Sequence, residues 1–216
     1  MLTITDYNLP DTKLLEKGTD GFLIWIPDKT YIVLGASNKA EDSLFTENVK
    51  QDNVTVMKRH SGGQAVMLTP NNLIISVVFV AKEAMKPKDI FFNINSLIVS
   101  ALERAGINDL SLKGISDIAI SGKKISGSAI YRNKDKLLYH AVLNLGEPAS
   151  TFERYLKHPV KEPDYRKGRN HTDFVTSLKD NGYSGSYDEL AGILSAMFTK
   201  KLTSNMVSSR TDLISC

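Results

Sequence analysis

The chain has 216 residues, of which 42% are hydrophobic and 24% charged, and its formal net charge is +3 at pH 7. This length suffices for one sizeable core and predicts a single domain over residues 1–216. Because 27 basic residues are nearly balanced by 24 acidic ones, the composition does not indicate a nucleic-acid partner and at most suits an acidic protein surface.

Cysteine usage and the N-terminus indicate the compartment. Cys216, the last residue, is the only cysteine, which excludes a disulfide framework, a thiolate metal site and an internal thiol nucleophile. No basic region precedes an apolar run at the N-terminus, and the apolar run over 73–81 has strand length, far below the roughly 20 residues that span a bilayer. We expect a soluble, cytoplasmic protein without membrane contact.

The first half of the chain predicts mainly strands. Residues 1–20 are polar and interrupted by Pro10 and Gly18, which predicts an irregular arm with at most a short strand. Apolar runs over 22–26 and 31–34 predict two strands joined as a hairpin through 27–29. A short helix is expected over 41–49 and a strand over 54–59. The nearly continuous apolar run over 73–80 predicts a central strand buried on both faces.

The second half alternates helices and strands. Pro87 and Asp89 open a helix whose apolar residues recur at helical spacing and which Gly106 closes, so this stripe is expected in the core. Consecutive strands are predicted over 115–120, 124–132 and 137–145, with a turn at 133–135. Helices are predicted over 151–156 and 186–202, and a loose tail over 203–216.

Two segments carry candidate chemistry, and each also has a plain structural interpretation. Over 121–131, Lys124 lies among small residues between strand-like runs, so its ammonium can face a cleft while Lys123 points into solvent. Over 58–66, the Ser-Gly-Gly turn can direct backbone N–H groups toward an anion, and Arg59 can bind a phosphate or carboxylate in a bidentate manner. A solvated turn and an ordinary hairpin remain the alternatives.

The order and content of the two segments together are more specific. Arg-x-Ser-Gly-Gly begins at Arg59, Gly-x-Lys-Ile-Ser-Gly-Ser-Ala follows about sixty residues later, and Tyr-His-Ala-Val-Leu begins at Tyr139. From about residue 31 to 178 the chain resembles the lipoate-protein ligase and octanoyltransferase family, kin to the biotin-protein ligases. The resemblance implies an α+β fold in which helices flank a mixed, mostly antiparallel β-sheet.

The resemblance also implies an enzyme. Such a ligase activates lipoate or octanoate with ATP and Mg²⁺ to an acyl-adenylate, then transfers the acyl group to one lysine of a small acidic lipoyl-carrier domain. It implies that Lys124 is catalytic and that Asp117 holds Mg²⁺, although Asp117 could equally cap a turn. The remaining ligand-binding residues that it implies are Arg59, Ser61, Gly62, Gly63, Gln64, Ala65, Val66, Met67, Ser126, Gly127 and His140.

Several positions depart from the family pattern. Gln64 stands where a third glycine is more usual, Ser116 replaces the Asn of an Asn-Asp pair, and Ala141 and Val142 replace Gly-Thr after His140. A lone strand histidine is also commonly a structural group. The proline-broken, basic segment over 159–169, with His171 after it, is expected at the surface or as a partner-docking segment rather than in catalysis.

The sequence also bears on four alternative functions or arrangements of this chain. A thioester-forming transferase lacks its thiol, since a histidine occupies position 158. The chain ends too early for the C-terminal accessory domain of many such ligases, so we expect either a separate accessory polypeptide or transfer of preformed acyl-adenylate. A non-catalytic lipoate- or carrier-binding module stays open. A biotin-protein ligase is disfavoured, because its Gly-Arg-Gly-Arg-x-Gly-Arg loop is absent.

Overall fold

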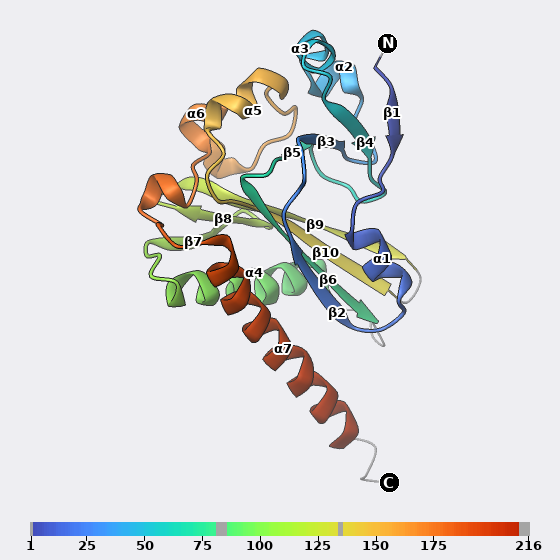
Figure 1. Ribbon diagram of the computed structural model, residues 1–216, viewed down its shortest axis with the longest axis vertical. Helices are drawn as coiled ribbons and strands as arrows, with labels where there is room; N and C mark the ends of the chain where they lie inside the picture. The colour runs from blue at the N-terminus through green and yellow to red at the C-terminus, as the bar shows by residue number, and fades with distance from the viewer. Residues whose placement is uncertain (1, 81–85, 134–135, 212–216) are drawn as a thin grey trace.

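Two β-sheets pack together in the computed structural model, which describes residues 2–80, 86–133 and 136–211 (Figure 1). The larger sheet has antiparallel neighbours throughout, in the order β2 (Gly21–Trp25), β6 (Asn72–Val80), β10 (Lys136–Asn144), β9 (Lys123–Asn133), β8 (Asp117–Ile120) and β7 (Leu110–Lys113). The smaller has the order β1 (Ile4–Asp6), β4 (Thr55–Lys58), β3 (Tyr31–Leu34) and β5 (Val66–Leu68).

The pairing of these strands confirms the predicted fold class. In the smaller sheet β4 pairs in parallel with both β1 and β3, whereas β5 is antiparallel to β3, so the β-structure as a whole is mixed and mostly antiparallel. The predicted central strand is also confirmed. Residues 72–78 of β6 are buried, and the strand pairs with β2 on one side and β10 on the other.

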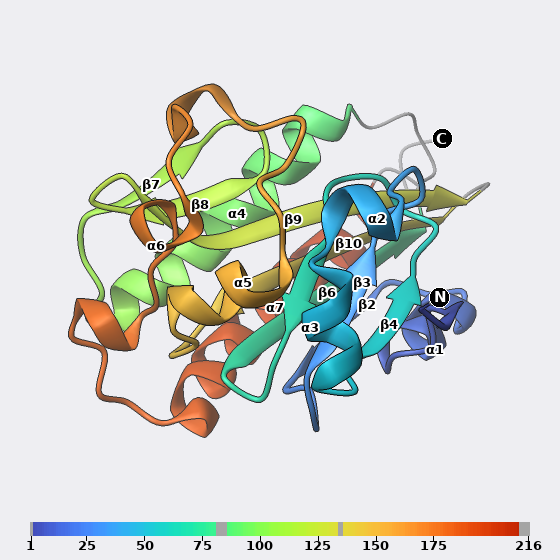
Figure 2. The same ribbon diagram turned by 90° about the horizontal axis from the view of Figure 1, so that it is seen from above.

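Two long helices, α4 (Pro87–Arg104) and α7 (Tyr187–Thr211), cover one face of the larger sheet (Figures 1 and 2). The proline in the first turn of α4 needs no intrahelical N–H partner there, and Gly106, at φ +84°, follows its end. The apolar stripe of α4 is core as expected. The buried residues of the two helices that join the main cluster are Ile90, Ile94, Ile98, Ala101, Leu102, Leu190, Leu194 and Phe198.

The opposite face of the larger sheet carries the smaller sheet and short helices (Figure 2). The single helix expected over 41–49 is divided into α2 (Ala40–Ser43) and α3 (Thr46–Gln51). The remaining short elements come late in the chain: α5 (Ala149–Tyr155), the 3₁₀ turn η1 (Asp164–Arg166), α6 (His171–Phe174) and the 3₁₀ turn η2 (Lys179–Asn181). The chain after α6 hydrogen-bonds the carboxyl end of β10, through Leu178 N to Asn144 O, and the start of β9, through Thr176 N to Lys124 O.

Three local predictions were wrong. Strands β2 and β3 do not form a hairpin, because they belong to different sheets and meet only through buried side chains such as Trp25 and Tyr31. The N-terminal arm contains a helix, α1 (Asp11–Glu16). The predicted loose tail is helical as far as Thr211, since α7 continues to that residue. Residues 212–216, including Cys216, lie outside the described residues.

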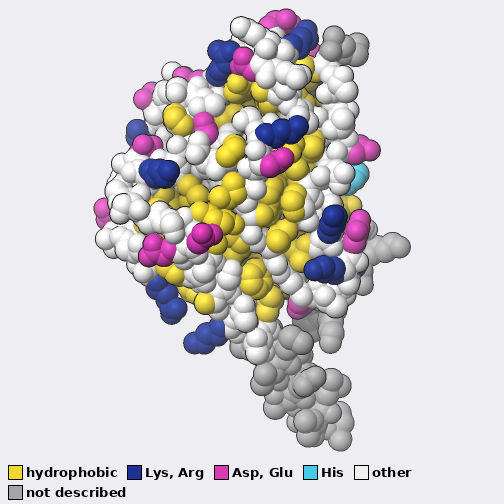
Figure 3. All heavy atoms as spheres, viewed as in Figure 1, with side chains coloured by type: hydrophobic (Ala, Val, Ile, Leu, Met, Phe, Trp, Pro, Cys, Tyr) yellow, Lys and Arg dark blue, Asp and Glu magenta, His cyan; other side chains and the backbone are white. Residues whose placement is uncertain are grey.

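The face seen in Figure 3 has hydrophobic side chains at its centre, with Lys and Arg interspersed among Asp and Glu around them. Charges of both signs alternate there rather than forming one basic field. Within the described part of the chain, every helix is too short or too polar to cross a bilayer.

Candidate functional site

A cavity of about 580 Å³ lies between the two sheets. The smaller sheet contributes residues of β3 and of the segment 59–68, the larger sheet contributes residues of β9 and β10, and the segment 157–175 closes one side. Its lining includes six basic side chains and two acidic ones, Asp42 and Asp117; the basic ones are Lys39, Arg59, Lys124, Lys157, Lys161 and Arg166. This size and charge suit an anionic small molecule.

A β-bulge directs Lys124 toward this cavity. Ile118 pairs with Ser126 but Ala119 pairs with Lys124, which leaves Ile125 as the extra residue of β9. The Lys124 ammonium then lies over Gly127, where an added Cβ would be 2.5 Å from Nζ, so any larger residue here would displace the ammonium. The backbone carbonyl of Lys124 accepts a 2.9 Å hydrogen bond from Thr176 N. As expected, the neighbouring Lys123 is exposed.

Asp117 is the acidic partner of Lys124. Its Oδ1 lies 2.9 Å from Nζ, and the two side chains are 8% and 30% exposed. Its Oδ2 accepts a 2.8 Å hydrogen bond from the Tyr165 hydroxyl. Among the described residues, no group of three or more His, Cys, Asp or Glu side chains could hold a metal ion. Asp117 therefore offers a single carboxylate, already shared by two donors.

Arg59 holds the glycine-containing loop from inside. The residue is 5% exposed, and burial lowers the pKa of its guanidinium to about 10, so it stays charged at neutral pH. Its donors bind the loop and the neighbouring strand β3: Nε to Ser61 Oγ (2.9 Å), Nη2 to Gly62 O and Gln64 O (both 2.9 Å), and Nη1 to Val33 O of β3 (3.1 Å). Four hydrogen bonds thus occupy most of the fork that the sequence assigned to a ligand.

The loop packs closely on the end of β3. Gly63 has φ +96°, a conformation that favours glycine. A Cβ at Gly35 would collide with the Gly63 carbonyl oxygen, and Ala36 N donates to Ser61 O at 3.0 Å. Asn38 Oδ1 accepts from Gly35 N at 2.8 Å and closes this turn beside the cavity. Glycine at positions 35 and 63 is therefore a steric requirement of the loop.

A buried polar chain connects this loop to the N-terminal helix. The Ser61 hydroxyl lies 3.0 Å from Nε2 of His140, whose Nδ1 lies 3.6 Å from Oδ2 of Asp11. Tyr7 and Ser76 donate to the Asp11 carboxylate at 2.8 and 3.2 Å. The order resembles a nucleophile, base and acid. However, the serine is 3% exposed and does not line the cavity, so we interpret the chain as a scaffold for the His140 ring.

The structure brings the predicted ligand-binding residues together around one space. Lys124 and Arg59 lie in the lining of the same cavity. Ser61 and Gly62 do not line it and support it through Arg59 and His140. The other predicted residues in the lining are Gly63, Gln64, Ala65, Val66, Met67, Asp117, Ser126, Gly127 and His140.

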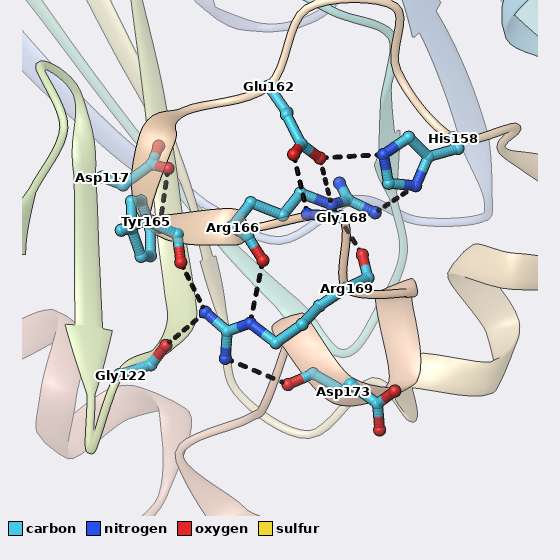
Figure 4. A network of polar contacts seen from close by, with 9 residues as sticks. All are labelled: Asp117, Gly122, His158, Glu162, Tyr165, Arg166, Gly168, Arg169 and Asp173. Atoms are coloured by element: carbon cyan, nitrogen blue, oxygen red, sulfur yellow. Dashed lines mark hydrogen bonds and ion pairs between the residues drawn. The ribbon is translucent and has the colours of Figure 1, made fainter.

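The segment over 159–169, expected at the surface or as a partner-docking segment, is exposed or half-buried except at Arg166. Arg166 is 4% exposed, and both Arg166 and His171 line the cavity. Figure 4 shows how the segment is held: His158 Nε2 lies 2.8 Å from Glu162 Oε2, and Gly168 N donates to Glu162 Oε1 at 2.8 Å. Sequence patterns gave no signal for this burial, because a basic, proline-containing stretch is normally solvated.

His171 makes stability depend on pH. Burial, together with the nearby positive charge of Arg166, lowers its pKa from 6.5 to about 4. The unfolded chain therefore binds this proton at higher pH than the folded one, so the contribution to stability is complete above pH 6.5 and is lost as pH falls toward 4. Discounting for partial exposure, we expect a loss of about 1–2 kcal/mol. Urea unfolding at pH 7.5 and 4.5 should show this loss in the wild type and a smaller one in His171→Asn.

Comparison with known proteins gives a consistent family. The family model described as lipoyl protein ligase A/B catalytic domain matches residues 5–199. Lipoate-protein ligase LplJ of Bacillus subtilis is 25% identical over 158 residues, which are 73% of this chain and 45% of that protein. Lipoate-protein ligase A of Blochmanniella floridana is 31% identical over 158 residues, 72% of this chain and 44% of that protein. The chain thus spans less than half the length of these relatives.

Solved structures share the fold. A bi-partite lipoate protein ligase of Thermoplasma acidophilum, described with its E2 lipoyl domain, superposes with a TM-score of 0.77 at 20% identity, covering 93% of this chain and 83% of that one. A lipoate-protein ligase A bound with ATP superposes with a TM-score of 0.75 at 21% identity, covering 89% of this chain and 78% of that one. Both superpositions cover most of this chain and therefore support the fold described above.

Proposed function

The chain belongs to the lipoyl protein ligase A/B catalytic-domain family, and from that premise we propose that it is a lipoate-protein ligase. It activates lipoate, or octanoate, with ATP to an acyl-adenylate and transfers the acyl group to a lysine of a small lipoyl-carrier domain. Residues 1–216 act as one catalytic domain in this proposal. A cytoplasmic location is part of it too, because the single cysteine suits a reducing compartment.

One observation supports this function above the others: Lys124 presents its ammonium to a basic cavity that also has an apolar wall. On β9 the small residues Gly127, Ser128 and Ala129 line it, and on β10 Val142 and Ala141 face the same space, with His140 opposite Ala129. Two strand residues correspond to about 7 Å. An aliphatic acid can therefore lie with its carboxylate at Lys124 and its chain directed toward His140.

The first half-reaction needs charge stabilisation more than proton transfer. An oxygen of the acid's carboxylate attacks the α-phosphorus of ATP, a new P–O bond forms, and pyrophosphate leaves. Lys124 orients that carboxylate, and its ammonium stabilises charge that develops between the reactants. The surrounding walls exclude water from the mixed anhydride, which would otherwise hydrolyse.

In the second half-reaction the amine of the carrier's lysine attacks the acyl carbonyl. A C–N bond forms, AMP leaves with the bonding electron pair, and the amine loses a proton. Lys124 lies beside the carbonyl oxygen, where it can stabilise the developing negative charge. No covalent acyl-enzyme is needed, in keeping with the position of the only cysteine at residue 216.

The nucleotide side of the cavity is assigned to the loop after β4 and the strand β5. Gly63, Gln64 and Ala65 line it there, and Arg59 holds them in place. Magnesium enters the proposal only as the ion that accompanies ATP. It would supply charge neutralisation at the phosphates. Of the two carboxylates in the lining, Asp42 and Asp117, Asp117 lies beside Lys124 and would hold the ion, since Mg²⁺ needs only one or two.

The proposal allows for a second polypeptide that this chain needs for adenylation. The bi-partite neighbour is a ligase of two components, and activity of the present chain in adenylation can depend on such a partner. If this chain instead only transfers preformed acyl-adenylate, it should acylate a carrier from that reagent but release no pyrophosphate from lipoate and ATP.

The experiment that tests the function incubates the purified protein with lipoate, Mg-ATP and a lipoyl-carrier domain. We expect pyrophosphate release and a carrier whose mass rises by one lipoyl group at a single lysine. Repeating the assay with octanoate compares the two acids. Failure of both pyrophosphate release and carrier acylation, with acyl-adenylate also inactive as a donor, would refute the proposal.

A further inference from the structure

We propose that Tyr165 is a positioning residue, which fixes the Asp117 carboxylate and through it the ammonium of Lys124. The inference rests on the proposed function, because that function gives Lys124 its role. Tyr165 itself does not line the cavity. It lies behind Asp117, on the segment that joins α5 to α6.

The two oxygens of Asp117 are divided between two donors. Oδ1 lies 2.9 Å from Lys124 Nζ, and Oδ2 accepts the Tyr165 hydroxyl at 2.8 Å. The carboxylate is 8% exposed, so it cannot exchange either partner for water without moving. Rotation of the carboxylate that breaks one contact also disturbs the other. The position of the ammonium therefore depends on the phenol on the far side.

The Tyr165 hydroxyl remains a donor throughout the working pH range. Burial, together with the adjacent Asp117 charge, raises its pKa well above the ordinary value. Its ring packs against Phe174 at a centroid distance of 5.1 Å, and this contact does not need the hydroxyl. Removing the oxygen alone should thus leave the ring in place and delete a single hydrogen bond.

Arg169 fixes the backbone that carries Tyr165. Its Nη2 donates to Tyr165 O at 2.8 Å and to Gly122 O at 3.1 Å, and its Nε donates to Arg166 O at 3.0 Å (Figure 4). Gly122 lies in the turn between β8 and β9, and Asp117 begins β8. Two side chains of this segment therefore bond the β8–β9 hairpin that bears Lys124: Tyr165 bonds Asp117, and Arg169 bonds Gly122. A backbone held in this way can transmit a defined position.

The expected effect is on the chemical step rather than on substrate affinity. Tyr165→Phe leaves Oδ2 of Asp117 without its donor, the carboxylate turns, and the ammonium moves with it. Small displacements of a catalytic group cost rate more than binding, so kcat for pyrophosphate release should fall about 10- to 100-fold. KM for ATP should stay within about twofold of the wild type. A residue that only supported the fold would lower the apparent kcat in proportion to the fraction folded and would leave the rate per folded molecule unchanged.

A double-mutant cycle tests the route of the effect. Tyr165→Phe, Asp117→Asn and the double variant are compared in pyrophosphate release, with circular dichroism as the check of folding. If Tyr165 acts through Asp117, the double variant is no slower than Asp117→Asn alone. Tyr183→Phe is the matched control, since its hydroxyl bonds Ser186 O at 3.0 Å outside the cavity, and it should behave as wild type. Independent, multiplicative effects would overturn the proposal.

A second measurement needs no catalytic activity. Trinitrobenzenesulfonate labels free amines, and mass spectrometry reports labelling of Lys124 relative to the exposed Lys123 beside it. Tyr165→Phe should raise this ratio several-fold, because the ion pair to Asp117 is loosened. An unchanged ratio in a folded variant would overturn the inference. If the wild type fails to use lipoate, the proposed function fails while this ratio still decides the role of Tyr165.

Discussion

Lys124→Ala should lower pyrophosphate release from lipoate and ATP by about a thousand-fold while the protein stays folded. The loss has two physical causes. The ammonium that holds the acid's carboxylate is gone, and Asp117, which is 2.9 Å from it, is left as an uncompensated negative charge in a cavity that must admit two anions. Steady-state assays of the purified variant measure the loss of activity. Its urea unfolding midpoint shows whether the protein stays folded.

Lys123→Ala is the matched control for that experiment. Lys123 neighbours Lys124 on β9 but is exposed, so its removal should change activity by less than about twofold. A carrier-binding module without turnover would give a different pattern, because both variants would then bind the carrier equally and neither would alter an acylation rate. Full acylation by Lys124→Ala would show that the ammonium has no part in the reaction.

The parts of the fold that the sequence predicts best are those decided by local pattern. The apolar run of β6 allowed only a doubly covered strand, and the spacing of apolar residues in α4 allowed only one buried face. Lys124 was identifiable because small residues surround it in the sequence, and the space that Gly127 leaves for its Nζ gives that motif a steric reason. At β6, α4 and the Lys124 segment, the pattern of neighbouring residues is therefore enough to predict the local structure.

The parts that could not be predicted depend on contacts between distant segments. Asp11 follows Pro10 in a polar arm, and no feature of the neighbouring sequence predicts that its side chain is fully buried against His140 and Ser76. Likewise Tyr165 reaches Asp117 across 48 positions of sequence. The separation of β2 from β3 has the same origin, because the partner strands that each one prefers lie elsewhere in the chain.

Arg59→Ala should lower the free energy of unfolding by about 3–5 kcal/mol. Its guanidinium serves three backbone carbonyls and the Ser61 hydroxyl while only 5% of the residue is exposed. Truncation leaves these acceptors without donors in a space that water fills poorly. The loop over Gly62 and Gly63 then loses its anchor, so nucleotide binding should weaken in parallel. Urea unfolding and calorimetric titration with ATP measure the two losses.

Arg154→Ala supplies the control. The guanidinium of this arginine is also hydrogen-bonded, with Nε 2.7 Å from Asp52 Oδ2, but its side chain is 45% exposed, whereas Arg59 is buried. Removal of the Arg154 side chain should leave the urea unfolding midpoint close to that of the wild type, because solvent screens an exposed ion pair. Arg59→Lys separates charge from geometry, because one ammonium cannot reach acceptors spread around a planar fork. We expect it to lose most of the stability that the alanine variant loses. If the lysine variant keeps both stability and ATP affinity, Arg59 acts as a charge facing the ligand, and the loop is held by other contacts.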